Sequence, residues 1–397
     1  MSEFRTIREL CSVVVDCPHS TPKWTANGKI VIRNKNIKHG KIDFSSPSYT
    51  DDEHFAQRIK RAKPQPGDII ITREAPIGDV GMIPENTECC LGQRMVLLRA
   101  NQSVCDNFYL LYSLQSLYVQ HQISWSEGTG TTVSNLRIPH LEQIQIPYLP
   151  LEQQAKISSV LRALEEKIEN NRRLNDNLQQ QAAALFESWF VNYDPWDGVQ
   201  PSEWENAPLG SFVEIKRGGS PRPIQDFLSD SGLRWLKISD VTSLSSPFVL
   251  EIKEHIKEEG LRKTVFLHAG ELVLSNSATP GIPKILDVDT CIHDGWLYFP
   301  KSELSKYYLY LFFKHIRKEL VALGNGSVFT NLKTDILKAF PATKADESTL
   351  KEFDALVTPL FDAMLNADRE NFKLAAMRDA LLPKLMSGEI DVSAIQL

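Results

Sequence analysis

Two long stretches of the chain carry mostly apolar side chains at alternating spacings of four and three residues, over 157–189 and 353–385. This spacing is the a/d pattern of a coiled-coil seam and predicts two long helices. A helix of about 35 residues is roughly 50 Å long, and a seam of this length needs a partner. We expect the two helices to pair antiparallel. The first seam contains Ile157, Leu161, Leu164, Ile168, Asn175, Leu178 and Leu185, and the second contains Phe353, Val357, Leu360, Met364, Asn371, Leu374 and Leu381.

Asparagines interrupt both seams near their middle, at Asn171, Asn175 and Asn371. A buried asparagine lowers the stability of a seam but fixes its register and its partner. The alternative is that the polar middle is solvated and fixes nothing. The sequence leaves both interpretations open.

Short β-rich runs separated by Gly, Pro and Asn turns precede each long helix, as at Ile69–Thr72. This pattern predicts mixed domains. We therefore divide the chain into a first mixed domain at 1–150, a helix at 151–190, a linker at 191–208, a second mixed domain at 209–345 and a helical segment at 346–397. A helical stretch is expected near 107–122 in the first mixed domain.

The second half of the chain repeats the first. The segment 128–136, Gly-Thr-Gly-Thr-Thr-Val-Ser-Asn-Leu, matches 324–332, Gly-Asn-Gly-Ser-Val-Phe-Thr-Asn-Leu, at an offset of 196 residues. The same offset superimposes the two seams. A period this long indicates tandem domains, not a solenoid. The expected fold class is α+β (mixed α/β), with two globular domains separated by a pair of long antiparallel coiled-coil helices in a pseudo-two-fold internal repeat.

The overall composition is that of an ordinary globular protein, with 42% hydrophobic residues and a net charge of −6. The sequence has no run of about 18 apolar residues, so it predicts no membrane-spanning helix. Six cysteines without a Cys-x-x-Cys pair indicate reduced thiols and a cytoplasmic location. The negative charge disfavours a nucleic-acid binder that acts alone, unless a partner supplies basic charge.

The sequence contains no convincing catalytic motif. Asn192-Tyr193-Asp194-Pro195-Trp196 has one proline where a methyltransferase loop needs two, and no phosphate-binding loop follows a strand. Glu251-Ile252-Lys253 could imitate a nuclease motif, but a solvated helix face explains it better. The histidines show no metal-ligand spacing. We expect no enzyme activity, no metal site and no cofactor bound by this chain.

The segment 126–136, followed by Ile144-Gln145-Ile146-Pro147 and by 149–157, Leu-Pro-Leu-Glu-Gln-Gln-Ala-Lys-Ile, resembles the end of a target recognition domain. Such domains belong to the DNA specificity subunits of type I restriction-modification systems. The segment 381–390, Leu-Leu-Pro-Lys-Leu-Met-Ser-Gly-Glu-Ile, is similar to the end of that family's second conserved helix. Residues 342–347 replace the Pro-rich start of the first helix, so the second helix is expected to begin with a different geometry.

The resemblance implies a non-catalytic subunit with two target recognition domains, each contacting one half of a split, asymmetric site in double-stranded DNA. It also implies that the paired helices set the spacer between the halves and dock two methyltransferase subunits. Those subunits would methylate adenine at N6 with S-adenosylmethionine. Two restriction subunits, using ATP and Mg²⁺, are an optional addition. A membrane partner is not expected.

Major-groove readout uses Arg or Lys for guanine, Asn or Gln for adenine and acidic groups for cytosine. Such side chains follow predicted strands in both halves, on loops that can present them to DNA. The candidates are Arg33, Asn34, Lys35, Asn36, Arg73 and Arg94 in the first domain, and Lys216, Arg217, Lys237, Ser239, Asp240, Asn276 and His293 in the second. For each residue, a solvated loop charge or a local turn hydrogen bond is the alternative.

Positions that differ between the two copies, such as Arg73 and its counterpart Asn276, are expected to determine which DNA sequence each domain recognises. Positions that recur, such as Asn135 and Asn331, are assigned to turn geometry. The basic run at 58–63 is expected either to clamp phosphates or to be a solvated helix end. The competing function is a two-domain protein-tethering scaffold without sequence-specific DNA binding, which would have no reason to place polar readers after equivalent strands.

Overall fold

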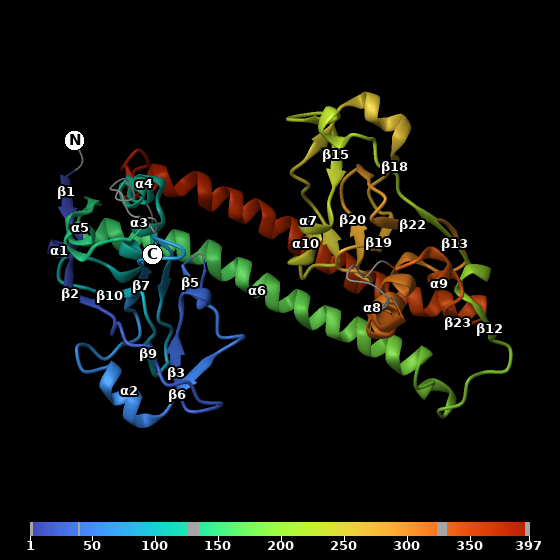
Figure 1. Cartoon of the computed structure of the whole chain (residues 1–397), viewed down its shortest axis with the longest axis horizontal. Coiled ribbons are helices and arrows are strands. Elements are labelled where there is room, and N and C mark those ends of the chain that lie inside the picture. Colours follow the sequence, from blue (N-terminus) through green and yellow to red (C-terminus); the bar gives the residue numbers. More distant parts are fainter. Residues whose placement is uncertain (1–2, 39, 126–134, 324–331, 394–397) are drawn as a thin grey trace. The chain divides into compact units, whose positions relative to one another are not determined.

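A computed structural model of the chain describes residues 3–38, 40–125, 135–323 and 332–393. It divides into two compact units: unit 1 comprises residues 1–167 and 374–397, and unit 2 comprises residues 168–373. The two long helices are α6 (Leu151–Phe190) and α10 (Glu347–Met386), and the division falls within both. Each unit thus combines one mixed domain with part of each helix (Figure 1).

Unit 1 is built around a four-stranded sheet in the order β2-β10-β7-β8 and a smaller sheet in the order β6-β3-β9. A β1–β11 ribbon and a β4–β5 hairpin complete its strands. The strands are β1 (Glu3–Thr6), β2 (Cys11–Asp16), β3 (Lys29–Ile32), β4 (Ile37–Lys38), β5 (Lys41–Ile42), β6 (Ser48–Thr50), β7 (Ile69–Thr72), β8 (Val80–Met82), β9 (Cys89–Leu91), β10 (Met95–Ala100) and β11 (Gln145–Tyr148). The helices are α1 (Ile7–Leu10), η1 (Asn34–Asn36), α2 (Asp52–Arg58), α3 (Asn107–Gln115), α4 (Leu117–Trp125) and α5 (Ile138–Gln143).

Unit 2 repeats this arrangement, with one sheet in the order β13-β22-β19-β20-β16, a second in the order β14-β17-β15-β21-β18 and a β12–β23 ribbon. The strands are β12 (Glu205–Pro208), β13 (Val213–Arg217), β14 (Leu228–Ser229), β15 (Leu233–Leu236), β16 (Phe248–Val249), β17 (His255–Ile256), β18 (Val265–Leu267), β19 (Leu272–Ser275), β20 (Pro283–Leu286), β21 (Thr290–Ile292), β22 (Trp296–Ser302) and β23 (Pro341–Lys344). The helices are η2 (Asp194–Trp196), η3 (Leu209–Ser211), η4 (Ile224–Asp226), α7 (Ile238–Thr242), η5 (Glu258–Lys263), α8 (Lys306–Leu323) and α9 (Thr334–Lys338). The strand orders confirm the mixed α+β class and the internal repeat.

One hydrogen bond shows how closely the two halves correspond. In unit 1 the Ser158 hydroxyl of α6 donates to Asp106, the residue that caps α3, at 2.5 Å. In unit 2 the Ser305 hydroxyl, which precedes α8, donates to Asp354 of α10 at 2.5 Å. The hydroxyl and the carboxylate have exchanged positions, but each mixed domain is fastened to its long helix in the same way.

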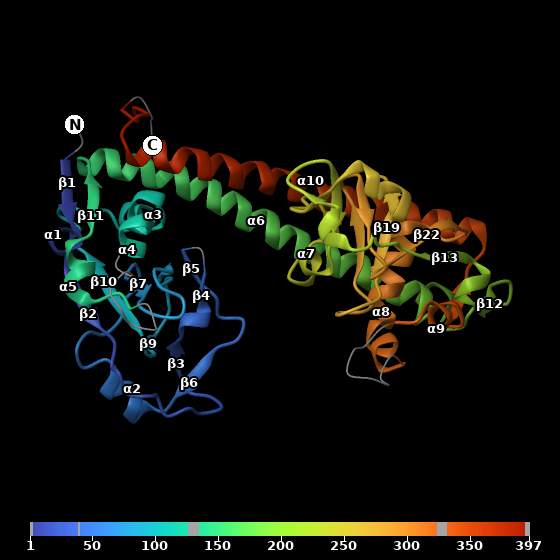
Figure 2. The same cartoon turned by 45° about the horizontal axis from the view of Figure 1, so that its top comes forward.

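Within each unit, the segments of α6 and α10 lie side by side and run antiparallel (Figure 2). Within unit 1, Arg378 lies 3.8 Å from Glu165. Within unit 2, Asn175 donates to Asp368 at 2.7 Å, and the Phe186 ring lies 6.3 Å from the Phe353 ring. Residue numbers therefore fall along α10 as they rise along α6, which is the expected direction of pairing.

The fourteen residues of the two seams are buried or half-buried. The buried members are Ile157, Leu161, Ile168, Asn175, Leu178, Phe353, Val357 and Met364, and the half-buried members are Leu164, Leu185, Leu360, Asn371, Leu374 and Leu381. Three further aromatic side chains outside the seams are also buried, namely Phe186, Phe190 and Phe361. An α-helix drifts by about 20° per heptad from a 3.5-residue repeat, so the buried face shifts from the seam where a domain core covers the helix.

The asparagines in the middle of the pair are buried and hydrogen-bonded. Asn171 is 4% exposed and donates to Glu370 at 2.7 Å and Asn371 at 3.0 Å, and Asn175 is 5% exposed. Because each donates across the pair to a specific residue of α10, a shifted register would leave them without these partners. The alternative of a solvated middle is wrong for these two residues.

The two long helices begin at equivalent positions, since Leu151 and Glu347 are 196 residues apart. The sequence predicted that the two helices would begin with different geometries, and the difference lies in the residue that precedes each helix. Asp346 accepts hydrogen bonds from the Thr349 amide at 3.0 Å and the Thr349 hydroxyl at 2.6 Å, whereas the first helix follows Pro150. The Ser348 and Thr349 hydrogen bonds hold the pKa of Asp346 well below its usual range.

Three local expectations need correction. The helical stretch near 107–122 is two helices, because Ser116 adopts an extended conformation between α3 and α4. The predicted linker includes β12, which pairs with β23. Residues 251–253 lie outside any helix, with Ile252 buried, so the sequence there is not a solvated helix face.

Candidate nucleic-acid interface

Two parallel strands end at the same sheet edge in each unit. In unit 1, β3 and β9 pair through Ile32 and Leu91, and in unit 2, β15 and β21 pair through Leu236 and Ile292. Parallel strands place their carboxyl ends together. The residues after them therefore meet, and this edge gathers the loops that follow β3, β7 and β9 in unit 1 and their counterparts in unit 2.

In unit 1 the edge joins the predicted side chains from three loops. Asn34 donates to the Glu74 carbonyl at 2.6 Å, and Arg94 forms an ion pair with Glu74 at 3.2 Å. The exposed Arg33 guanidinium lies 5.0 Å from the centre of the Trp24 ring. Lys35 is also exposed. Arg33, Lys35 and Arg94 are thus exposed cations on loops that follow strand ends.

The side chains of Asn36 and Asp240 form local hydrogen bonds with the backbone. Asn36 accepts from the Arg33 amide at 3.0 Å, and Asp240 accepts from the Lys237 amide at 2.9 Å. Asn36 is also buried and donates to the Asp43 carbonyl at 2.9 Å. Each side chain caps the short helical turn after its strand, which is the local hydrogen bond that polar turn residues commonly make.

Arg73 and Asn276 also support the frame. The Arg73 side chain is only 11% exposed, forms two bonds to Asp16 at 2.8 and 2.9 Å and donates to the Leu136 carbonyl at 2.9 Å. The Leu136 amide donates to the Arg73 carbonyl at 3.0 Å, and the Leu332 amide donates to the Asn276 carbonyl at 2.7 Å. Both residues anchor the same loop end in their units, so their geometry opposes the expected role of sequence-determining contacts.

The repeated Gly-rich segments lie mostly outside the described residues. This applies to 128–134 and 324–331, including Asn331. Asn135 is described, and it accepts a hydrogen bond from Arg73 at 3.2 Å. That contact agrees with the assignment of Asn135 to the frame.

In unit 2 the edge contains an open depression of about 820 Å³. Its lining includes Arg222, Trp235, Lys237, Ser239, Ser277 and His293. The sequence pattern after the strands pointed to Lys237, Ser239, Ser277 and His293, and it missed Arg222 and Trp235. The sequence signal that could have indicated this site is Gly218. A Cβ at this position would come within 2.3 Å of the His293 carbonyl, so the backbone that leads to residues 220–224 passes close to His293.

Lys216 and Arg217 lie at the end of β13 and are exposed. Lys216 forms an ion pair with Glu214 at 2.8 Å, and Arg217 donates to the Asp294 carbonyl. Burial opposes ionisation of Asp294, but the Ser220 hydrogen bond and the nearby arginines lower the pKa of this carboxyl below its usual range. Asp294 is therefore charged beside the depression.

The basic run does not form a phosphate clamp as a whole. Arg58 is 6% exposed, and its guanidinium donates to the carbonyls of Leu91 at 2.7 Å, Gly92 at 2.8 Å and Ser20 at 3.0 Å. Lys63 forms an ion pair with Glu88 at 3.0 Å. Arg58 is a buried structural residue, so it is neither part of a phosphate clamp nor a solvated helix end.

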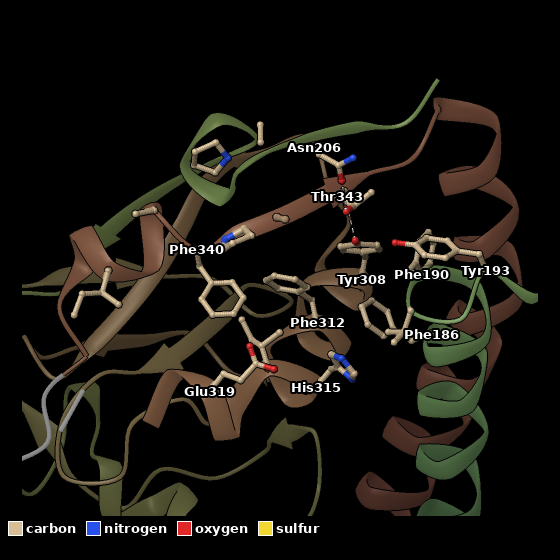
Figure 3. Close-up of a pocket in the computed structure, with 18 residues that line it drawn as sticks. Phe186, Phe190, Tyr193, Asn206, Tyr308, Phe312, His315, Glu319, Phe340 and Thr343 are labelled. Carbon is tan, nitrogen blue, oxygen red and sulfur yellow. Dashed lines mark hydrogen bonds between the residues drawn. The ribbon is translucent and has the colours of Figure 1, made fainter. Parts of the chain in front are cut away.

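Unit 2 also contains a cavity of about 1020 Å³ beside the end of α6 (Figure 3). Its lining includes the aromatic side chains of Phe186, Phe190, Tyr308, Phe312 and Phe340. It shares no lining residue with the depression. Its aromatic residues belong to the hydrophobic core of unit 2, so we assign it no role in the interface.

The described residues contain no group of three His, Cys, Asp or Glu side chains placed to hold a metal ion. All six cysteines are buried as free thiols, as expected. In the described helices, none is long and apolar enough to cross a membrane.

Two copies of one mixed domain, each fastened to a shared pair of antiparallel helices, define a tandem-repeat protein with a variable polar edge on each copy. The family "Type I restriction modification DNA specificity domain" matches residues 3–180 and 201–343. The chain belongs to this family. Its resemblance to specificity subunits, inferred from the repeated motifs, is thereby confirmed.

Two relatives agree with this assignment, and one solved structure has a similar fold. The chain is 25% identical over 348 residues to the type I restriction enzyme MjaIX specificity subunit of Methanocaldococcus jannaschii, covering 83% of this chain and 79% of that protein. It is 23% identical over 360 residues to the HindI specificity subunit of Haemophilus influenzae, covering 72% and 78%. The crystal structure of an S subunit from M. genitalium is similar in fold, with a TM-score of 0.62, 18% identity and coverage of 97% and 96%.

Proposed function

We propose that this chain is the DNA sequence-specificity subunit of a type I restriction-modification complex, which binds a bipartite, asymmetric site in double-stranded DNA. The observation that carries the proposal is the repeated edge. Unit 1 presents Arg33, Lys35 and Arg94 there, and unit 2 presents Ser239 and His293 on an equivalent frame. One scaffold with two sets of polar side chains suits two different half-sites.

The proposal assigns residues 1–150 and 209–345 to two target recognition domains, and residues 151–190 and 346–397 to the conserved helices. A helix of 40 residues is about 60 Å long at 1.5 Å per residue. Successive major-groove faces on one side of B-DNA recur about every 34 Å. The helix pair is therefore long enough to act as a ruler, and buried Asn171 and Asn175 give it a fixed register.

We further propose that the chain is non-catalytic and binds no cofactor. Two methyltransferase subunits, docked on the helices, would carry S-adenosylmethionine and methylate adenine at N6. Restriction subunits, where present, would use ATP and Mg²⁺. The family assignment and the names of the relatives support this division of labour. The net charge of −6 disfavours a chain that binds DNA alone, but partner subunits can supply the positive charge that binds phosphates.

The test is to co-express the chain with its methyltransferase subunit in a host lacking adenine methylation and to sequence the methylome. The expected result is N6-methyladenine at one split motif that disappears without this chain. Methylation at no defined motif, with a methyltransferase shown to be competent with another specificity subunit, would favour the tethering scaffold instead.

A further inference from the structure

The depression in unit 2 lies where strands β15, β19 and β21 end, and it is closed on one side by the segment 220–224. Its walls are partly apolar, with the buried indole of Trp235 beside Pro221 and Ile224. Hydroxyl groups of Ser239 and Ser277 add polar atoms to the lining. A flat ligand with polar edges fits this combination of walls and hydrogen-bonding groups.

The two cations that line the depression, Arg222 and Lys237, are already paired. Arg222 forms an ion pair with Asp294 at 3.0 Å, and Lys237 forms one with Glu254. The two pairs carry no net charge. A phosphate would have to compete with both carboxylates for these cations, whereas an uncharged nucleobase would not. The charge balance therefore favours a base edge over a DNA phosphate.

His293 supplies a single, oriented donor to this neutral site. Its Nδ1 accepts a hydrogen bond from the Gly295 amide at 2.8 Å, so the hydrogen of the neutral ring is on Nε2. Burial lowers the pKa of His293, which keeps the ring neutral. In the described part of the chain no group accepts a hydrogen bond from Nε2.

The ring orientation of His293 is fixed by its surroundings. Its centre lies 5.8 Å from that of Trp235 and 6.4 Å from that of Trp296. A Cβ on Gly295 would come within 2.3 Å of the imidazole, so the backbone there passes directly against the ring. A donor with a fixed orientation can discriminate between bases, because the ring cannot move to reach an acceptor in a different position.

We propose that His293 is a specificity-determining residue that donates its Nε2–H to N7 of one purine in the half-site read by unit 2. This assignment rests on the proposed function. N7 is an acceptor that both purines present in the major groove, so the contact selects a purine over a pyrimidine at one position. The equivalent position in unit 1 is Gly92, which also follows the parallel strand pair, so this contact belongs to the second half-site alone.

The experiment uses the complex of the full chain with its methyltransferase subunit and begins with the wild-type methylome. Duplexes carrying the resulting motif are then made with a 7-deazapurine at each purine in turn, which removes N7 and leaves the pairing edge intact. For the wild type, one position in one half-site should weaken binding about tenfold, the effect of one lost hydrogen bond. For His293→Ala the same substitution should have no effect, and its methylome should accept a pyrimidine at that position.

The matched control is His268→Ala, because His268 is an exposed histidine of unit 2 that does not line the depression. It should retain the wild-type motif and the sensitivity to 7-deazapurine. A wild-type complex that tolerates 7-deazapurines at every position overturns the assignment, even if His293→Ala fails to fold. Equal weakening by His293→Ala on all sequences, with a shallower salt dependence, would indicate a phosphate contact and overturns it as well. A wild-type complex without any motif overturns the proposed function itself.

Discussion

At the scale of single residues, side chains that look alike in the sequence have opposite roles in the structure. Arg33 and Arg94 are exposed at the strand-end edge, whereas Arg73 and Arg58 are held by protein acceptors. A charged side chain whose hydrogen bonds are all satisfied internally cannot contact DNA without breaking them. Burial and partners, not residue type, therefore separate the candidate readers from the frame.

Arg58 tests this distinction. Replacing it with Met removes the donors from the buried carbonyl groups of Leu91 and Gly92 and from the part-buried carbonyl of Ser20, and we expect the free energy of unfolding to fall by about 2–4 kcal/mol. Urea denaturation of the full chain measures this change. The exposed Arg61→Met is the control and should cost less than about 0.5 kcal/mol. Unchanged stability together with a weaker salt dependence of DNA binding would restore the phosphate-clamp interpretation.

Asp346 predicts a pH dependence at the start of α10. Its pKa is lowered in the folded chain, so its stabilising contribution is complete above the unfolded value near 4 and is lost as the pH falls through the folded value. Asp346→Ala should cost about 1 kcal/mol at pH 7, since it removes a helix N-cap. The difference from wild type should narrow below about pH 4 in urea titrations. The exposed Asp230→Ala should show neither effect, and a difference independent of pH would contradict the cap assignment.

At the scale of elements, the sequence predicted most of the architecture. The 4,3 spacing located both long helices, because an amphipathic period kept over so many turns is typical of a coiled coil, and the offset of 196 residues revealed the tandem domains. The burial of Phe186 and Phe361 was not predictable, since it depends on which part of a mixed domain covers each helix. The break at Ser116 was missed because no proline or glycine marks it.

The edge residues show a similar limit. The strand ends identified Lys237, Ser239 and His293, because loops after strands can be located from local patterns. Arg222 and Trp235 join them only through tertiary packing of a distant segment and a buried strand face. The capping hydrogen bonds of Asn36 and Asp240 were not predicted, because a capping side chain and a DNA-reading side chain share the same residue types.

The register of the helix pair depends on its polar middle. Asn175 donates to Asp368 at 2.7 Å, and burial raises the pKa of that carboxyl. Asn175→Leu removes the donor and should lower the free energy of unfolding by about 2 kcal/mol. The control Asn177→Leu alters an exposed position on the same helix and should cost less than about 0.5 kcal/mol. Thermal and urea denaturation of the full chain measure both, and equal effects would show that Asn175 makes no specific contribution.

At the scale of the whole molecule, the repeat explains how one chain can read two unlike sequences. The mixed domains share strand orders and the Ser–Asp fastening to their helices, and they differ at the exposed edge. The side chains at the exposed edge can therefore change while the strand order and the attachment to the helices stay the same. Each domain should be replaceable without disturbing what the other one reads.

Exchange of residues 1–145 for the corresponding segment of another family member with a known target tests this claim most directly. The hybrid is co-expressed with the methyltransferase subunit, and its methylome is compared with those of both parents. The account predicts that one half of the split motif changes to that of the donor, while the other half and the spacer length remain those of this chain. A hybrid that stays folded and active but changes both halves would contradict the account.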